Sequence, residues 1–441
     1  MVVIGSSLEK IQNARRIGVI GAGYVGLPLA AILSHLGHSV TLAEQNESRL
    51  ALIRQGISPI VEHGLEELLA EGISTARLRL VKLASQATQG AEFVFLCIGT
   101  PQAPDGSADM SQLIAAVSEL AAHLSDGAIL INKSTSPVGT LKLIERIIAR
   151  PDVTVVSNPE FLREGSAVAD SLDPDRIVVG ANDPAIANRV VELLGHRQVP
   201  VVITDSTTSE LIKYASNAFL ATKLTFINTM ARLCEAVGAD VQDLVSGIGY
   251  DKRIGFDFMR PGPGWGGSCL PKDTAALMAL ADQAGIDMSF LRAAIAGNEA
   301  QLDHVVEKIK LAVGGDLNGR VIGVLGLTFK ANTNDRRNSP AIWITQRLVE
   351  KGAIVRAFDP TVTKDSTDID DLGHVEVLDD PYGAVAGSHA IAVLTEWQEF
   401  RWLDFARIRE EVLTPVIVDA RGLLDVAPLQ LLGFTHSRIG Q

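Results

Sequence analysis

The sequence predicts an α/β protein in which two doubly wound parallel-sheet domains are joined by a central helical domain. Two stretches of the chain alternate short apolar runs with helical patterns, and the stretch between them carries long helical patterns instead. At about 150 residues per domain, a chain of 441 residues accommodates three such domains. We expect them at residues 1–205, 206–315 and 316–441.

In the first stretch, the apolar runs are rich in Val, Ile and Leu on both faces, which is typical of buried parallel strands in a Rossmann-like sheet. The predicted strands are Arg16–Ile20, Ser39–Ala43, Glu92–Ile98, Ala128–Asn132, Val153–Ser157, Arg176–Gly180 and Val199–Thr204. Periodic segments between these strands, such as Leu113–Leu124 and Gly139–Ala149, predict crossover helices.

The middle stretch has long helical patterns over Thr208–Gly238 and Thr274–Val313, separated by the Gly- and Pro-rich segment Gly247–Pro271. From residue 320 the strand–helix alternation resumes. The predicted strands there are Val321–Leu327, Ile354–Phe358, Val375–Leu378, Ala390–Leu394 and Val416–Asp419, and the predicted helices are Ala341–Lys351 and Phe405–Val412.

Composition favours a cytoplasmic enzyme. Asp and Glu number 52 against 39 Lys and Arg, a net charge of −13 that disfavours binding to nucleic acid. No apolar run approaches the ~20 residues of a membrane span, and the first residues do not resemble a secretion signal. The spacing of Cys97, Cys234 and Cys269 indicates neither a disulfide framework nor a metal site.

A dinucleotide-binding turn follows the first strand at residues 21–26, Gly-Ala-Gly-Tyr-Val-Gly, and a helical pattern begins directly after it. We expect the cofactor to meet Gly21, Gly23, Tyr24, Val25 and Gly26. The next strand ends at Glu44, whose carboxylate can accept hydrogen bonds from a ribose diol and repels a 2′-phosphate, so NAD is favoured over NADP. FAD uses the same turn, which alone leaves both cofactors open. Thr100 and Thr135 follow two further strands and can also face the cofactor.

A reactive cysteine is predicted within residues 262–273, Gly-Pro-Gly-Trp-Gly-Gly-Ser-Cys-Leu-Pro-Lys-Asp. Cys269 follows a glycine-rich segment and precedes a helix expected to begin near Asp273, and helix N-termini favour the thiolate. Asp273 can cap that helix or act as a base. A thiol nucleophile beside a nicotinamide implies carbonyl oxidation through a thiohemiacetal and a thioester. Oxidation of an aldehyde, or four-electron oxidation of an alcohol with two NAD, both fit.

Several motifs together resemble the nucleotide-sugar 6-dehydrogenase family, with the UDP-glucose branch as the most similar. They are the glycine turn, residues 158–165 (Asn-Pro-Glu-Phe-Leu-Arg-Glu-Gly), 173–176 (Asp-Pro-Asp-Arg), 213–217 (Lys-Tyr-Ala-Ser-Asn) and 266–273. The resemblance runs in order from about residue 15 to 425. It implies an NAD domain, a helical dimerisation domain and a nucleotide-sugar domain.

The resemblance also implies residue roles. Cys269 matches the nucleophile, Lys213 and Asn217 match the groups that stabilise the oxyanion, and Asp273 matches the acid that orders a water with Lys213. Glu160 matches the base for thioester hydrolysis, with Thr135 on the same water. Cofactor contacts are implied for Glu44, Arg49, Thr100, Thr135, Glu164 and Arg337. Substrate contacts are implied for Phe161, Leu162, Arg163, Lys213, Asn217, Arg253, Phe258, Gly266, Phe329, Lys330 and Arg421. Arg253 resembles a residue that crosses the interface of a homodimer or higher oligomer.

Alternatives remain at this point. Ser268 and Lys272 argue against the N-acetyl-sugar branch, whereas the cysteine motif does not separate UDP-glucose from GDP-mannose dehydrogenases. The base of the nucleotide is open, with dTDP-glucose a further candidate. A two-electron dehydrogenase of hydroxy acids or sugar phosphates also combines a Rossmann domain with a helical domain, but Cys269 and the second α/β domain speak against it. A non-enzymatic NAD sensor would not need a nucleophile, an acid and a base.

Overall fold

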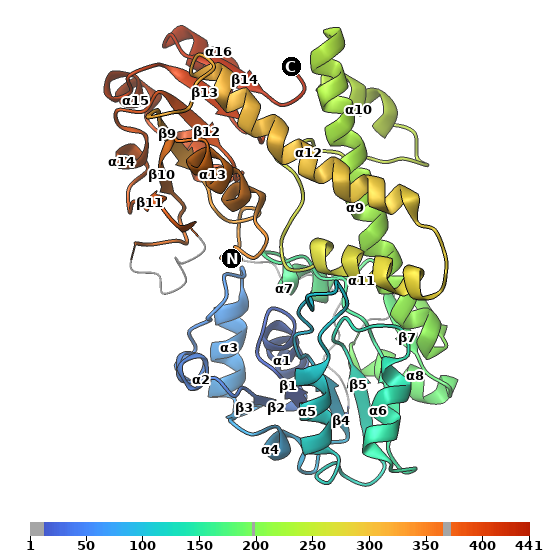
Figure 1. Ribbon diagram of the computed structural model, residues 1–441. Coiled ribbons are helices and arrows are strands. Elements are labelled where there is room, and N and C mark those ends of the chain that lie inside the picture. The colour runs from blue at the N-terminus through green and yellow to red at the C-terminus, as the bar shows by residue number, and fades with distance from the viewer. Residues whose placement is uncertain (1–12, 196–198, 365–371) are drawn as a thin grey trace. The chain divides into compact units, whose positions relative to one another are not determined.

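A computed structural model describes residues 13–195, 199–364 and 372–441. The chain forms two compact units. The boundary between them along the chain falls between Ser216 and Asn217, inside the long helix α9 (Ser206–Val237). Each unit is built around one sheet (Figure 1).

The first unit contains, among the described residues, an eight-stranded sheet in the order β3-β2-β1-β4-β5-β6-β7-β8. Its strands are β1 (Arg16–Ile20), β2 (Ser39–Ala43), β3 (Leu78–Val81), β4 (Phe93–Leu96), β5 (Ile129–Asn132), β6 (Thr154–Ser157), β7 (Ile177–Gly180) and β8 (Val201–Thr204). The strands from β3 to β6 pair in parallel, which was predicted for all of them except β3, a strand that was not predicted. The expectation that the parallel sheet continues through β7 is wrong, because β7 pairs antiparallel with β6; β8 runs parallel to β7.

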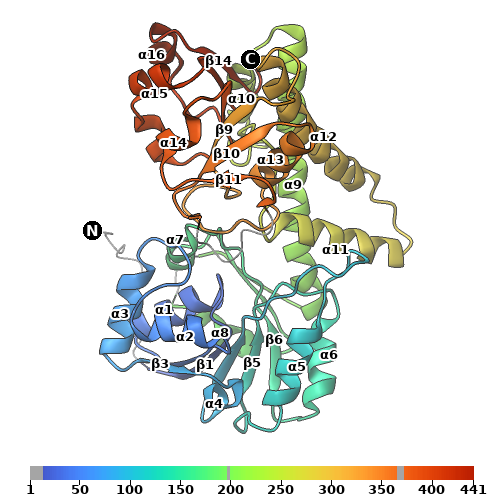
Figure 2. The same cartoon turned by 60° about the vertical axis from the view of Figure 1, so that its left-hand side comes forward.

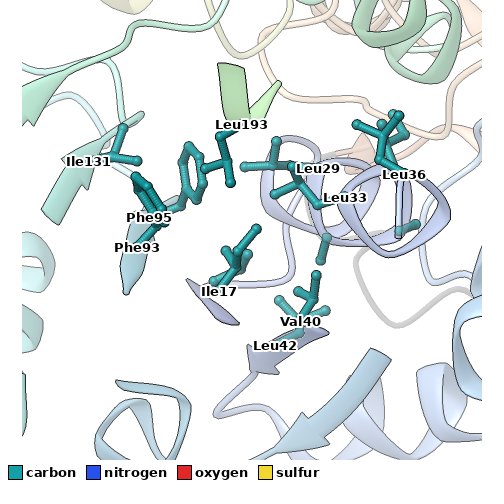
Figure 3. Packing of buried hydrophobic residues seen from close by; sticks show 14 of the residues in the cluster. Ile17, Leu29, Leu33, Leu36, Val40, Leu42, Phe93, Phe95, Ile131 and Leu193 are labelled. Carbon is teal, nitrogen blue, oxygen red and sulfur yellow. The ribbon is translucent and has the colours of Figure 1, made fainter. Parts of the chain in front are cut away.

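Side chains alternate between two cores because successive residues of a strand point to opposite faces of the sheet. Ile17 and Phe93 enter one core, whereas Val94 and Leu96 enter the other. Figure 3 shows the first core, where Leu29 and Leu33 of α1 pack over the sheet. The helices of this unit are α1 (Gly26–His35), α2 (Glu47–Arg54), α3 (Leu65–Ser74), α4 (Ala84–Thr88), α5 (Ser111–Leu120), α6 (Thr140–Ile148), α7 (Ala167–Leu172) and α8 (Pro184–Leu193).

The helical region continues from α9 through α10 (Val241–Gly249), α11 (Leu270–Gln283) and α12 (Ser289–Ala312). The helical pattern over Thr274–Val313 is divided between α11 and α12. α11 ends before Gly285, whose φ of +69° suits glycine and closes the helix. Among the described residues, no helix combines the length and apolar character that a membrane span requires.

The second unit contains a six-stranded sheet among its described residues, in the order β11-β10-β9-β12-β13-β14, with every pair parallel. Its strands are β9 (Val321–Leu325), β10 (Ile354–Phe358), β11 (Glu376–Val377), β12 (Ala390–Val393), β13 (Val416–Asp419) and β14 (Thr435–Arg438). One core lies toward α9, α12 and α13 (Pro340–Glu350). The other includes residues of α14 (Pro381–Val385), η2 (Gln398–Trp402), α15 (Phe405–Glu411) and α16 (Val426–Leu431). Figure 2 shows α14, α15 and α16 on the side of this sheet away from α12.

Candidate active site

The three glycines of the turn after β1 are needed for different reasons. Gly21 has a φ of +97°, and a Cβ there would lie 2.5 Å from the carbonyl oxygen of Cys97. A Cβ on Gly26 would lie 1.9 Å from the carbonyl oxygen of Gly21, so α1 could not pack this closely. At Gly23 a Cβ would meet nothing within 4 Å among the described residues. Packing therefore does not require Gly23, whereas close approach of a pyrophosphate does.

Glu44 connects this turn to the end of β2. Its carboxylate accepts hydrogen bonds from the N–H groups of Ala22 (3.3 Å) and Asn46 (2.8 Å) and remains partly exposed. Asn46 in turn caps α2 by accepting from the N–H of Arg49. The arrangement places an acid beside the glycine turn, where it fits a ribose diol.

The loops after β4 and β5 are linked by a hydrogen bond between two threonines. The buried Thr100 donates its hydroxyl to the carbonyl oxygen of Thr135 at 2.5 Å. Ser134 also links the loops, because its Oγ accepts from the N–H of Ile98 at 2.9 Å. Both threonines lie where predicted, at the carboxyl ends of parallel strands, and Thr135 keeps its side chain partly exposed.

Glu160 and Lys213 form a buried ion pair in the first unit. Lys213 Nζ lies 2.8 Å from Glu160 Oε1, and the two side chains are 4% and 6% exposed. Glu160 Oε2 also accepts the N–H of Leu162 at 2.7 Å. Burial alone would raise the pKa of Glu160, but Lys213, the Leu162 N–H and Lys133 together hold it below its ordinary value. The carboxylate is therefore held in its ionised form.

The start of α9 is anchored close to Lys213. Ser209 Oγ and Ser157 Oγ form a buried hydrogen bond of 3.0 Å. Glu210 accepts the N–H groups of Gly139 (2.6 Å) and Leu141 (2.9 Å) at the N-terminus of α6. These contacts fix the first turns of α9 on the sheet and thereby set the position of Lys213.

The residues after Glu160 are held in different ways. The guanidinium of Arg176 lies 3.8 Å from the centre of the Phe161 ring, and Lys213 Nζ lies 5.4 Å from it. Arg163 is exposed and pairs with Asp170 at 2.6 Å. Glu164 is partly buried. Arg176 and Lys133 are contacts of this group to which the sequence analysis gave no role. The available signals were the motif 173–176 for Arg176 and, for Lys133, its position directly after a buried strand.

Cys269 is the N-cap of α11, so the helix begins three residues earlier than predicted. The thiol is partly exposed, lies 3.5 Å from Ser268 Oγ and sits where the helix dipole favours negative charge. A Cβ on Gly266 would lie 2.0 Å from the carbonyl oxygen of Asn338, and one on Gly267 would lie 2.9 Å from the Phe329 ring. Two of the glycines thus let the cysteine loop pack on its neighbours.

The other two cysteines pack in hydrophobic cores. Burial raises the pKa of Cys97 to about 12, and Cys234 is buried on α9.

Asp273 does not cap α11, which corrects one of its two predicted roles. Its fully buried carboxylate accepts from Asn217 Nδ2 at 2.6 Å and from Lys272 Nζ at 2.5 Å. Asn217 and Lys213 lie four residues apart on α9, yet Asn217 pairs with Asp273 and Lys213 pairs with Glu160. Two polar residues of α9 are therefore each paired with a buried acid, one in each unit.

Three predicted substrate residues meet in the second unit. Arg421 donates from Nε to the carbonyl oxygen of Leu394 (2.8 Å) and from Nη2 to that of Phe329 (2.7 Å). It also pairs with Glu396 at 3.0 Å. Lys330 lies over the Phe329 ring, with Nζ 5.5 Å from its centre. Two cations and an aromatic ring therefore gather near the ends of β9 and β13.

Three other predicted site residues lie on loops of the second unit. Arg337 pairs with Asp335 at 2.7 Å, and Arg253 pairs with Asp251 at 2.6 Å while 88% of its side chain stays exposed. Phe258 has a φ of +58°, which is strained for an aromatic residue. Among the described residues, no group of three or more His, Cys, Asp or Glu side chains is arranged to hold a metal ion.

The parallel sheet, the glycine turn and the acid after β2 define the class of dinucleotide-dependent dehydrogenases. Three models of the UDP-glucose/GDP-mannose dehydrogenase family match the chain: the NAD binding domain at residues 15–198, the central domain at 207–300 and the UDP binding domain at 323–426. The protein belongs to this family, and the predicted cofactor, NAD, is confirmed.

Individual proteins of this family are similar to the chain over nearly its whole length. A UDP-glucose 6-dehydrogenase of Rhizobium meliloti is 43% identical over 439 residues, covering 97% of this chain and 99% of the relative. One of Bacillus subtilis is 40% identical over 433 residues, covering 97% and 93%. The structure of a UDP-glucose dehydrogenase from Pyrobaculum islandicum superposes with a TM-score of 0.88 at 33% identity, covering 98% of this chain and 99% of that one.

Proposed function

We propose that the protein oxidises carbon 6 of UDP-glucose to the carboxylic acid, a four-electron reaction that uses two NAD. The observation that carries the proposal is the partly exposed thiol of Cys269 at the N-terminus of α11, in a chain that also holds an NAD site. UDP-glucose is supported by relatives named UDP-glucose 6-dehydrogenase at 40–43% identity and by the match to a UDP binding domain. The three domains proposed from the sequence, 1–205, 206–315 and 316–441, each contain one family match.

NAD is held, in this proposal, by the turn from Gly21 to Gly26, with Glu44 on a ribose and Arg49 over the adenosine. Thr100, Thr135, Glu164 and Arg337 are the further contacts proposed. When bound, NAD accepts a hydride in each of the two oxidations. Gly23 fits this role because its α-carbon borders open space among the described residues, and Glu44 fits because it is partly exposed.

Cys269 provides the covalent path. Its thiolate attacks the aldehyde carbon to form a thiohemiacetal, which is oxidised to a thioester. The ionised Glu160 then takes a proton from a water hydrogen-bonded by Thr135, and that water attacks the thioester and releases Cys269 as the thiolate. Lys213 and Asn217 stabilise the oxyanion, and Asp273 orders the water with Lys213. The buried pairs Lys213–Glu160 and Asn217–Asp273 support these roles, since each presents a polar group already oriented by a partner.

The nucleotide sugar is held, we propose, by the aromatic and cationic groups of the second unit together with the segment 161–163. An acidic protein needs local positive charge for a diphosphate, which Lys330 and Arg421 supply. Phe258, Gly266 and Phe329 are the remaining contacts proposed there.

A homodimer completes the proposal, with Arg253 reaching the partner's sugar-nucleotide site. Phe219, Phe226 and Leu233 lie seven residues apart on α9 and are 69%, 48% and 51% exposed, an apolar stripe that a second copy would cover. Arg253 is itself exposed. Light scattering of the active protein should give the mass of a dimer or a higher oligomer; a fully active monomer would contradict this. The cytoplasmic location stays a prediction.

The substrate is tested with a panel of nucleotide sugars, and the formation of NADH is followed by its absorbance. We expect UDP-glucose to give the highest kcat/KM, with dTDP-glucose, GDP-mannose and UDP-N-acetylglucosamine as the comparison substrates. Preference for GDP-mannose would move the protein to the other branch of its family, and activity on a simple hydroxy acid alone would refute a nucleotide-sugar substrate.

A further inference from the structure

Lys133 is a buried lysine to which the proposed mechanism gives no role. It directly follows β5, and 9% of its surface is exposed. Its Nζ donates to Asn158 Oδ1 at 3.0 Å, and the N–H of Asn158 donates to the carbonyl oxygen of Asn132 at 2.9 Å. A buried lysine is unfavourable unless its charge and donors are used. Here the lysine connects the end of β5 to the segment that carries Glu160.

Four titratable groups face one another in this part of the first unit: Lys133, Lys213, Glu160 and Cys97. Burial lowers the pKa of Lys133, Cys97 and Glu160 act in the opposite direction, and Lys213 adds to the lowering. Burial also raises the pKa of Cys97 to about 12, so this thiol is neutral at ordinary pH. Glu160 is thus the carboxylate of the group. Lys213 is in direct contact with it, and Lys133 is hydrogen-bonded to Asn158 of the same segment.

Lys213 alone would not keep Glu160 ionised throughout the proposed reaction. Lys213 lies 2.8 Å from Glu160 and is also the group proposed to stabilise the oxyanion of the substrate. When the Lys213 ammonium turns toward a new negative charge, its hold on Glu160 weakens, and a buried carboxylate without a cation tends to protonate. Lys133 bonds to Asn158 instead of Glu160, so it can keep its place while Lys213 changes partner.

We propose that Lys133 is a positioning residue for Glu160: it fixes the segment from Asn158 to Glu160 and keeps a second positive charge near the carboxylate when Lys213 acts on the substrate. The inference rests on the proposed role of Glu160 as the base. It predicts that the charge of Lys133, as well as its hydrogen bond, is needed for turnover at low pH.

The test compares Lys133→Gln, Lys133→Met and Lys133→Arg by the pH dependence of kcat for UDP-glucose oxidation. Gln keeps a donor for Asn158 and loses the charge, Met loses both, and Arg keeps the charge. The charge-free variants should have the acidic limb of the profile at higher pH than the wild type. Their kcat should fall by about tenfold or more relative to wild type near pH 6, and by less near pH 8.5. Lys133→Arg should keep the wild-type limb.

The control is Lys142→Gln, which removes an exposed lysine on α6 in the same unit and should leave the profile unchanged. Thermal unfolding checks that each variant is folded, and Met, unbranched and apolar, provides the second charge-free variant if Gln does not fold. Wild-type profiles in the charge-free variants would overturn the inference. So would an equal loss at every pH in all three, which indicates packing alone. A wild-type protein inactive on UDP-glucose would refute the proposed function instead.

Discussion

The two sheets of the protein share one construction and use it differently. Strands β3-β2-β1-β4-β5-β6 of the first sheet and β11-β10-β9-β12-β13-β14 of the second have the same order and are parallel. In each, an acid directly follows the second strand, Glu44 after β2 and Asp359 after β10. Each acid accepts backbone N–H groups from the turn after the first strand: Ala22 for Glu44, and Leu327 and Thr328 for Asp359.

The two acids differ in how much hydrogen-bonding capacity each carboxylate has left for a ligand. Asp359 is 1% exposed and also accepts from Trp397 Nε1 (3.1 Å) and from the hydroxyl and N–H of Thr361. A carboxylate offers about four lone-pair sites, so Asp359 is saturated. Glu44 stays partly exposed and can accept a ribose diol. The same strand order thus supports a cofactor site in one sheet and a structural anchor in the other, because the side chains decide the function.

The largest expected effect separates chemistry from cofactor binding. Cys269→Ser should lower steady turnover of the sugar by at least about a thousandfold, roughly 4 kcal/mol, because an alkoxide is a far poorer leaving group than a thiolate. NAD affinity, measured by calorimetry, should barely change, since the first sheet is untouched. Intact-protein mass after mixing with NAD and substrate should reveal a persistent ester.

Two matched cysteine variants serve as controls for this prediction. Cys97→Ala and Cys234→Ala should keep most activity, because both thiols are packed groups. Activity lost in either of them and retained in Cys269→Ser would mean that the nucleophile is another residue.

The next effect concerns the saturated acid. Asp359→Asn replaces an acceptor by an amide N–H that faces donors, which should cost about 2–4 kcal/mol of stability. It should also raise the KM for the sugar, because Asp359 anchors the turn before Phe329 and Lys330. Glu44→Gln should change stability by about 0.5–1 kcal/mol. Denaturation curves that reverse this order would break the comparison between the two acids.

The smallest effect sharpens the role of Glu44. The wild type should favour NAD over NADP by at least about tenfold in kcat/KM, or about 1.4 kcal/mol, because the carboxylate repels a 2′-phosphate. Glu44→Gln should reduce that preference, and Asp359→Asn should leave it unchanged. Equal use of the two cofactors by the wild type would mean that Glu44 does not face the ribose.

Much of the fold could be predicted because buried parallel strands are apolar on both faces; Arg16–Ile20, Ser39–Ala43, Ile354–Phe358 and Val416–Asp419 match the structure residue for residue. β3 and β14 were missed because they are edge strands with polar side chains such as Arg79 and His436. The reversal at β7 was missed because an apolar run carries no direction.

The local setting of the candidate site residues could be predicted from the sequence, whereas their pairing could not. Glycines, a cysteine in a glycine-rich loop and acids at strand ends have local signatures. The pairing of Lys213 with Glu160, and of Asn217 with Asp273, depends on contacts between distant segments. Lys133 gave no periodic signal, and its hydrogen bond to Asn158 joins residues that are 25 positions apart in the sequence.

The central claim, four-electron oxidation of one substrate, is tested most directly by counting NADH per molecule of UDP-glucose with NAD in excess and the sugar limiting. The account predicts two NADH per sugar, the acid as sole product and no aldehyde trapped by hydroxylamine. A yield of one NADH with free aldehyde released would contradict it, because Cys269 would then not hold the substrate between the two oxidations.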